Sequence, residues 1–228
     1  MIPYKDSVPS RRFPFVTVLL IAANVFVFLY QVVLPEPAAT QFVYQYSVIP
    51  LEFRLGHNVE ISPGLPPLVT IFTSMFLHGG WLHLIGNMLY LWIFGDNVEE
   101  VLGPIRFLIF YLLCGVVASF AQIYSNFRSD IPALGASGAI AGVLAAYIRL
   151  YPKAKVAVLV PVFYFLRSVI LPAWLVLGLW FLIQILEARM LPAKEAGGVA
   201  YFAHIGGFVA GLLLLPLFRP RTAKRRAR

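Results

Sequence analysis

Long apolar runs alternate with short polar segments along the chain, and this pattern predicts a membrane protein. The runs cover approximately residues 13–34, 68–94, 104–124, 135–151, 168–190 and 199–218. Most of them approach the ~20 residues that an α-helix needs to cross a bilayer, and they do not alternate as the strands of a membrane barrel do. We therefore predict an all-α polytopic membrane protein built as a bundle of six transmembrane helices. A further apolar stretch, residues 156–166, is too short to span.

The composition agrees with this prediction. Of the 228 residues, 60% are hydrophobic and only 12% are charged, with a mean hydropathy of +0.82, whereas a soluble domain carries about a quarter charged residues. The net charge of +8 raises the possibility of nucleic-acid binding. Basic residues also gather on the cytoplasmic side of membrane proteins, and we prefer this explanation. The single cysteine, Cys114, excludes a disulfide framework.

The distribution of basic residues predicts the orientation of the bundle. Six spans put both ends of the chain on one side, and that side would hold 14 of the 18 Lys and Arg residues. By the positive-inside rule both termini are then cytoplasmic. We expect a cytoplasmic N-terminus over residues 1–12, one membrane domain over 13–218 and a basic cytoplasmic tail over 219–228.

Four polar residues interrupt the apolar runs at a shared depth. Ser137, His83 and His204 each lie one or two turns into a span that starts on the non-cytoplasmic side, which is ~5–10 Å below that surface at 1.5 Å per residue. Asn87 lies one turn after His83 on the same helix face. Three separate helices thus bring polar side chains into one shallow layer, a coincidence that favours a common site.

Each of these residues also has a simpler interpretation. A membrane serine usually bonds back to its own helix, Asn87 alone could join two helices, and a histidine could be a structural hydrogen-bond partner, although ionisable residues within spans are mostly functional. Taken together they favour catalysis. Ser137 would be the nucleophile and His204 its general base and acid. Asn87, His83 and the Ser137 amide would stabilise the oxyanion.

The acidic residues limit this site to two catalytic groups. All ten Asp and Glu residues fall in predicted loops or at span ends, so we predict a Ser–His dyad without a carboxylate to orient His204. The spacing of His83 and Asn87 resembles a zinc-binding helix motif, but the second imidazole and the glutamate are absent. We expect neither a metal nor another cofactor.

Small residues on two predicted spans explain how Ser137 and His204 could meet. Gly138 and Gly142 form a GxxxG pattern on the serine helix, and Gly207 and Gly211 form another on the histidine helix. Such faces allow helix backbones to approach closely in a membrane. Ordinary helix packing without catalysis would use the same glycines.

These motifs resemble those of the rhomboid family of intramembrane serine proteases. The resemblance rests on His83-Leu84-Ile85-Gly86-Asn87 (HxxxN), on Gly135-Ala136-Ser137-Gly138 (GxSG) and on His204 in Ala203-His204-Ile205-Gly206-Gly207. Glu99 also fits the acidic residue that the family carries after the second span. The resemblance covers about residues 13–218 and implies the bacterial six-helix type, with Gly135 and Gly138 beside the oxyanion.

Several functional expectations follow from the resemblance. It implies a water-filled cavity near the outer face of a bacterial plasma membrane, and cleavage of single-span transmembrane substrates near the outer end of their helix. Its substrates would reach the cavity laterally from the lipid bilayer, past Trp174, Trp180 and Phe181.

The sequence departs from the family pattern at two places. Many relatives carry an aromatic residue four positions after the serine, where this chain has Ala141; Tyr201 or Phe202 is our candidate to hold the His204 ring instead. A Trp-Arg pair of many relatives is replaced near Val69-Thr70. We assign His78, where relatives also tend to have histidine, to the lining of the water path.

Two alternatives belong to other functional classes. A catalytically inactive rhomboid-like protein that binds transmembrane helices would be expected to lack Ser137 or His204, and both are present. A transporter would show internal repeats with helices broken near the middle of the membrane, and no repeat is visible in the sequence.

Overall fold

A computed structural model describes residues 2–59, 64–162, 165–190 and 200–220 of the chain. The fold is mostly helical, as the apolar runs predict. The segment between the predicted runs 168–190 and 199–218, which we expect to be a loop over residues 192–198, and the tail residues 221–228 lie outside the described residues.

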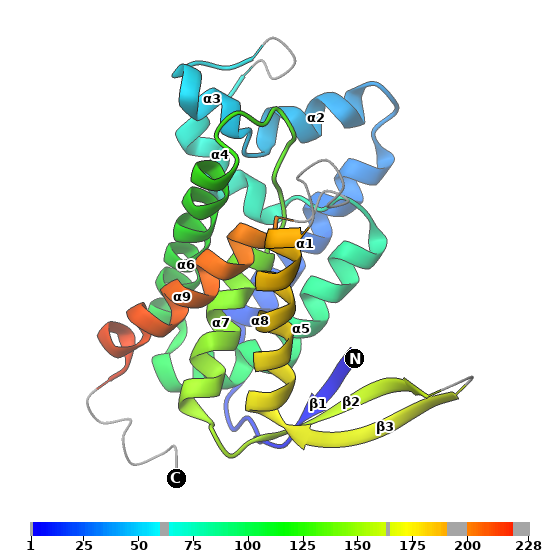
Figure 1. Ribbon diagram of the computed structural model, residues 1–228, viewed down its shortest axis with the longest axis vertical. Helices are drawn as coiled ribbons and strands as arrows, with labels where there is room; N and C mark the ends of the chain where they lie inside the picture. Colours follow the sequence, from blue (N-terminus) through cyan, green and yellow to red (C-terminus); the bar gives the residue numbers. More distant parts are fainter. Residues whose placement is uncertain (1, 60–63, 163–164, 191–199, 221–228) are drawn as a thin grey trace.

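Long helices of alternating direction form the body of the molecule (Figure 1). Four of the helices in the described part of the chain are long and apolar enough to cross a membrane. The bent pair of α4 (Pro67–Thr73, continued by a 3-10 turn to Phe76) with α5 (Trp81–Leu102) makes a fifth candidate span. Their ends agree with the predicted runs to within a few residues, apart from α5, which continues past residue 94, and α8, which starts after residue 168. The bounds of the helices are α1 (Phe15–Val33), α5 (Trp81–Leu102), α6 (Pro104–Ser125), α7 (Ser137–Leu150), α8 (Ala173–Met190) and α9 (Tyr201–Phe218).

Helix α7 is the remaining predicted span, and with 14 residues it is shorter than a typical one. Every residue from 138 to 147 is buried, because glycine and alanine let α6 and α9 pack closely around it. The first residue of α7, Ser137, therefore lies inside the bundle rather than at its surface. The number of six spans remains a prediction.

The polypeptide between α1 and α5 covers one end of the bundle. It forms α2 (Ala38–Tyr46), α3 (Pro50–Leu55), α4 (Pro67–Thr73) and the 3-10 turn η1 (Ser74–Phe76). Backbone hydrogen bonds of 3.0 and 2.8 Å join Val48 to Ala133, in the segment that leads to α7. At Gly79-Gly80 the chain turns by 81° between α4–η1 and α5, as the interruption of this apolar run predicts.

A three-stranded sheet at the other end of the bundle corrects the sequence prediction. Strands β1 (Ile2–Asp6), β2 (Lys155–Val162) and β3 (Phe165–Pro172) pair antiparallel in the order β1-β2-β3. We predicted a helical span from residue 168, but residues 168–172 belong to β3. β-Branched side chains and prolines at positions 161 and 172 disfavour a helix here.

The position of the acidic residues after residue 94 also differs from the sequence prediction. Asp96, Glu99 and Glu100 do not follow the second span, because α5 continues to Leu102 and includes them in its last two turns. Glu99 is buried and its carboxylate accepts hydrogen bonds from the backbone of α1, so it joins two helices at the end of the bundle opposite to α2 and α3.

Candidate active site

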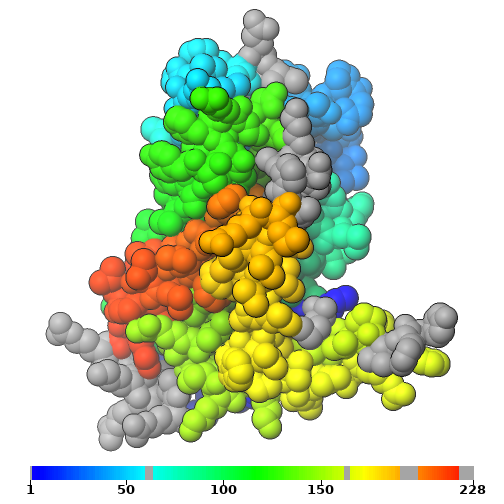
Figure 2. Space-filling model, viewed as in Figure 1, coloured from blue at the N-terminus to red at the C-terminus, as the bar shows by residue number. Residues whose placement is uncertain are grey.

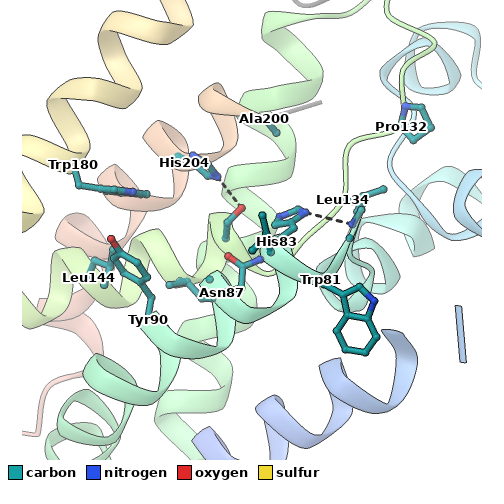
Figure 3. A pocket seen from close by; sticks show the side chains of 16 residues that line it. Trp81, His83, Asn87, Tyr90, Pro132, Leu134, Leu144, Trp180, Ala200 and His204 are labelled. Carbon is teal, nitrogen blue, oxygen red and sulfur yellow. Dashed lines mark hydrogen bonds between the residues drawn. The ribbon is translucent and has the colours of Figure 1, made fainter. Parts of the chain in front are cut away.

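Ser137 and His204 form a hydrogen bond in the interior of the bundle. Ser137 is the first residue of α7 and His204 is the fourth residue of α9. The serine Oγ lies 2.7 Å from Nε2 of the histidine (Figure 3), and the imidazole is buried. The geometry allows the hydroxyl to donate to Nε2, as a serine nucleophile requires of its general base.

The close contact of α7 with α9 depends on the glycines of the two GxxxG patterns. A Cβ atom built on Gly207 would collide with the carbonyl oxygen of Gly138, and one on Gly211 would collide with that of Gly142. Gly142 also packs on Cys114 of α6, whose Cβ lies 2.6 Å from a Cβ built there. The backbones of α7 and α9 are thus nearly in contact, which brings Ser137 within hydrogen-bonding distance of His204.

Helix α8 holds the other side of the His204 ring. Nδ1 of His204 donates to Oε1 of Gln184 at 2.5 Å, and the Gln184 amide Nε2 donates to the Trp180 carbonyl at 3.3 Å. This second bond fixes the amide with its oxygen toward the imidazole. A proton on Nδ1 leaves Nε2 as the acceptor that faces Ser137.

Aromatic rings complete the surroundings of His204. The Trp180 ring lies 5.6 Å from the imidazole at an angle of 37°, and the Tyr201 ring lies 6.4 Å away, edge-on. The sequence suggested Tyr201 or Phe202 in place of an aromatic residue at Ala141. Tyr201 is indeed a neighbour of the ring, whereas Phe202 is exposed. Trp180 and Gln184, which contact the ring from α8, were not assigned this role from the sequence.

His83, Asn87 and Gly135 gather beside Ser137. The Gly79 amide donates to Nδ1 of His83 at 3.4 Å, which leaves Nε2 as the protonated nitrogen. Gly135 has a φ of +120°, and a Cβ there would lie 2.8 Å from Nε2 of His83 and 3.7 Å from the Asn87 amide nitrogen. Only glycine suits both this backbone conformation and this approach.

His78 supports Asn87 from behind. Its Nε2 lies 3.0 Å from the Asn87 amide nitrogen, and its backbone exchanges two hydrogen bonds of 3.2 Å with the Gln31 side chain. The prediction that His78 lines the water path is wrong, because the residue is buried and does not border the cavity. A histidine in the turn before α5 instead fixes the orientation of the amide.

The start of α7 offers backbone donors at the same place. The N-cap residue of this helix, Ala136, makes no side-chain cap hydrogen bond, and the first N–H groups of a helix have no partners within it. The amides of Ser137 and Gly138 belong to this first turn, where the helix dipole also favours negative charge. An oxygen anion next to Ser137 would therefore meet backbone donors as well as Asn87 and His83.

A cavity of about 710 Å³ opens beside these groups. Apolar side chains cover most of its wall. The ring centroids of Tyr90 on α5 and Trp180 on α8, which both line the cavity, are 6.5 Å apart. In the described part of the chain no group of three or more His, Cys, Asp or Glu residues could hold a metal ion. The side chains with polar groups that border the cavity are those of Trp81, His83, Asn87, Tyr90, Ser137, Trp180 and His204 (Figure 3).

Comparison with known proteins relates this fold to a family. Residues 66–221 match the model of the Rhomboid domain. Rhomboid protein 1, mitochondrial, of Saccharomyces cerevisiae is 32% identical over 149 residues, which cover 64% of this chain and 40% of the yeast protein. Presenilin-associated rhomboid-like protein, mitochondrial, of Bos taurus is 35% identical over 150 residues, covering 64% and 36%.

A plant relative extends the comparison. Rhomboid-like protein 11, chloroplastic, of Arabidopsis thaliana is 29% identical over 167 residues, which cover 69% of this chain and 55% of the plant protein. The chain thus spans less than half the length of the yeast and bovine relatives. The domain match includes His83, Asn87, Ser137 and His204. This membrane protein belongs to the rhomboid family.

Proposed function

We propose that the protein is an intramembrane serine endopeptidase that cleaves membrane-anchored substrates near the outer end of their transmembrane helix. The observation that supports this most is the 2.7 Å hydrogen bond between Ser137 and His204 at the wall of a cavity. Hydrogen-bond donors on the same side of the cavity would stabilise the charge that develops on the carbonyl oxygen.

The first half of the reaction would acylate Ser137. Its Oγ attacks the scissile carbonyl carbon while the hydroxyl proton moves to Nε2 of His204. The carbonyl oxygen becomes an anion and is stabilised by Asn87, His83 and the backbone N–H groups of Ser137 and Gly138. The carbon–nitrogen bond then breaks, and the proton on Nε2 passes to the departing amine.

The second half would release the other product. Water enters the cavity and attacks the acyl carbon, giving its proton to Nε2 of His204. The ester bond to Ser137 breaks, and the serine oxygen takes the proton back. The products are a carboxylic acid and an amine, and the enzyme returns to its starting state.

Gln184 would take the place of the carboxylate in a Ser–His–Asp triad. It accepts a hydrogen bond from Nδ1 of His204, so it fixes the tautomer and the orientation of the ring. A neutral amide supplies less stabilisation to an imidazolium than a carboxylate does. We infer that the pair works as a Ser–His dyad with an orienting glutamine.

The nature of the substrate follows from the membrane setting. A spanning helix protects its peptide bonds with its own backbone hydrogen bonds, so a segment that unwinds easily would be preferred. The cavity lies between α5 and α8, where Tyr90 faces Trp180. We propose that a single-span protein reaches Ser137 laterally between these helices, past Trp180.

The orientation in the membrane is part of the proposal. Lys5, Arg106 and Lys155 belong to the end of the bundle with the sheet, which the positive-inside rule assigns to the cytoplasm. The active site would then lie toward the outer face. A bacterial plasma membrane was predicted, but the named relatives are mitochondrial and chloroplastic and do not support that choice.

The test is cleavage of a single-span substrate by the purified protein in liposomes. Wild type is compared with Ser137→Ala and His204→Ala, and we expect a cut near the outer boundary of the substrate that both variants lose. Equal cleavage by all three proteins would refute the assignment. If none cleaves, labelling with a fluorophosphonate decides: Ser137 that does not react would favour an inactive protein that binds transmembrane helices.

A further inference from the structure

The β2–β3 hairpin exposes large apolar side chains outside the helices that are long and apolar enough to cross a membrane. Phe165, Leu166 and Ile170 are 70%, 65% and 67% exposed. The strands project sideways beyond the helices at the end of the bundle that carries the sheet (Figures 1 and 2). Exposure of such side chains to water is unfavourable. A contiguous exposed apolar patch therefore marks a binding surface.

Only one face of the hairpin is covered near the helices. Val156 and Val158 are buried against the bundle, and Leu171, the cross-strand partner of Val156, packs on the same core in part. Val169, the partner of Val158, is exposed. The opposite face carries the pairs Ala157–Ile170 and Pro161–Leu166. On that second face Leu166 and Ile170 remain exposed, whereas Val156 and Val158 on the first face are buried.

Strand β3 is also an edge of the sheet, and the edge is apolar. The strand order β1-β2-β3 leaves one side of β3 without a paired strand in the described part of the molecule. Edges that face water are normally protected by charges or prolines, because they otherwise pair with other chains. Within Phe165–Pro172 only Arg167 is charged, so the sequence suits an apolar surrounding better than water.

The exposed charges on the strands and just before β2 are basic. Lys5, Lys153, Lys155 and Arg167 are exposed, and residues 131–186 include neither Asp nor Glu. Asp6 is the one acidic residue within the strands, and it points inward, where it accepts a hydrogen bond from Tyr147. This arrangement complements the anionic headgroups of a phospholipid bilayer.

The hairpin continues into a surface that already faces lipid. Strand β3 ends at Pro172, and α8 begins at Ala173. The outer side of α8 carries exposed Trp174, Leu175 and Leu179, which contact acyl chains in a membrane-spanning bundle. The apolar residues of β3 extend this lipid-facing side toward the headgroups without a polar break apart from Arg167 and Ser168.

We propose that the β2–β3 hairpin is a membrane-interface anchor that binds anionic phospholipids at the end of the bundle carrying the sheet. The side chains of Leu166 and Ile170, which share the uncovered face, insert among the acyl chains near the glycerol level, and Phe165 does so from the other face at the far end of the hairpin, beyond the buried valines. Lys155 and Arg167 contact the headgroups. This proposal rests on the membrane fold alone and does not depend on proteolytic activity.

Fluorescent labels on the full-length protein test the depth of the hairpin. In a Cys114→Ala background, single cysteines at Leu166 and Ile170 carry an environment-sensitive dye, and Arg128→Cys at the opposite end is the matched control. The protein is placed in phosphatidylcholine vesicles with and without phosphatidylglycerol. Quenching by iodide in water is compared with quenching by nitroxides on the upper part of the acyl chains.

We expect iodide quenching at Leu166 and Ile170 to be roughly a third or less of that at Arg128, with strong nitroxide quenching, since interfacial residues sit ~5–10 Å deep. Equal iodide quenching at the three positions would overturn the proposal. Shielding that disappears on dilution of the protein in lipid would mean a second copy on the β3 edge and would also overturn it.

A double variant tests whether the basic side chains of the hairpin bind anionic lipid. Replacing Lys155 and Arg167 together with glutamine removes two exposed charges and leaves the apolar residues in place. We expect nitroxide quenching at Ile170 to increase with phosphatidylglycerol in the parent protein and to lose this increase in the double variant. The same quenching in both lipid mixtures for both proteins would refute the selectivity for anionic lipid.

Discussion

Gln184 accepts a hydrogen bond from Nδ1 of His204 at 2.5 Å, on the side of the ring opposite to Ser137. The donor that fixes Gln184 is its own amide nitrogen, which bonds to the Trp180 carbonyl one turn earlier in α8. The base of the proposed protease is thus oriented by a helix other than the two that carry the dyad. A displacement of α8 would change the orientation of His204 as well as the width of the cavity.

Replacing Gln184 with leucine should lower kcat by about 10- to 100-fold, the usual cost of losing the group that orients a functional imidazole. Leucine has a similar size but cannot accept the Nδ1 proton. KM should change much less, because Gln184 does not border the cavity. Steady-state cleavage of a transmembrane substrate in liposomes measures both constants.

Gln184→Glu is the matched control for this prediction. Both variants change the same position in α8, but a carboxylate accepts the same hydrogen bond from Nδ1 of His204. The glutamate variant should therefore keep most of the kcat that the leucine variant loses. If leucine and glutamate lowered kcat equally, the role of Gln184 would be packing of α8 rather than orientation of His204.

Asn87→Ala should lower kcat by about 10²- to 10³-fold, the typical effect of removing one oxyanion donor. The amide borders the cavity next to Ser137 and is held by His78 at 3.0 Å. Binding of the substrate helix should be nearly unchanged, so KM should stay within a small factor. Asn126→Ala, which removes an amide from the loop after α6, should leave both constants unchanged, and an equal loss in that variant would contradict the oxyanion role.

Sequence patterns predicted the central residues of the site because each carries a strong local signal. Polar side chains in apolar runs pointed to His83, Asn87, Ser137 and His204, and the structure brings all four to one cavity. Gln184 carries a similar signal, since it is the one amide in α8. It was not recognised because its partner is 20 residues later, and only the packing of α8 on α9 shows that they meet.

The sheet was harder to predict, because its strands come from distant parts of the chain. Strand β1 starts at Ile2 and pairs with β2 at Leu159, and a local apolar pattern contains no information about such a partner. Length alone suggested that residues 156–166 could not span a membrane, which agrees with the structure. The strands could have been predicted from the valines of residues 156–162 and from Pro161 and Pro172, because these residues disfavour a helix.

Gly207→Ala should destabilise the bundle by about 1–3 kcal/mol, as overpacking of a tight contact does. The added methyl group would collide with the carbonyl oxygen of Gly138, so α9 must move away from α7. Because this motion also separates His204 from Ser137, activity should fall by more than the change in stability explains. Thermal unfolding in detergent and substrate cleavage are the two measurements.

Gly178→Ala provides the comparison for this substitution. In the described part of the chain, nothing besides the backbone of α8 and the two neighbouring residues lies within 4 Å of a Cβ built on Gly178, so the same change of residue type should leave stability and cleavage almost unchanged. Equal unfolding temperatures for the two variants would show that the close contact of Gly207 with Gly138 does not determine the stability of the bundle.

Glu99→Ala should reduce stability by about 1–3 kcal/mol, because it removes a charged acceptor from buried donors. The Glu99 carboxylate accepts hydrogen bonds of 2.9 Å from the Val16 amide and 2.8 Å from both the amide and the hydroxyl of Thr17. The N-cap residue of α1, Pro14, makes no side-chain cap hydrogen bond, and an acidic residue on α5 caps the helix instead.

The position of Glu99 separates this effect from catalysis. It lies 16 residues after His83 on the same helix, about 24 Å away at 1.5 Å per residue, so cleavage by the folded fraction of Glu99→Ala should match wild type. Glu100→Ala is the control, because its carboxylate accepts a hydrogen bond from the backbone amide of Arg11 at an exposed site and should contribute little to stability. A Glu99→Ala protein that is as stable as wild type but inactive would mean that this carboxylate acts on the site and not on the α1–α5 contact.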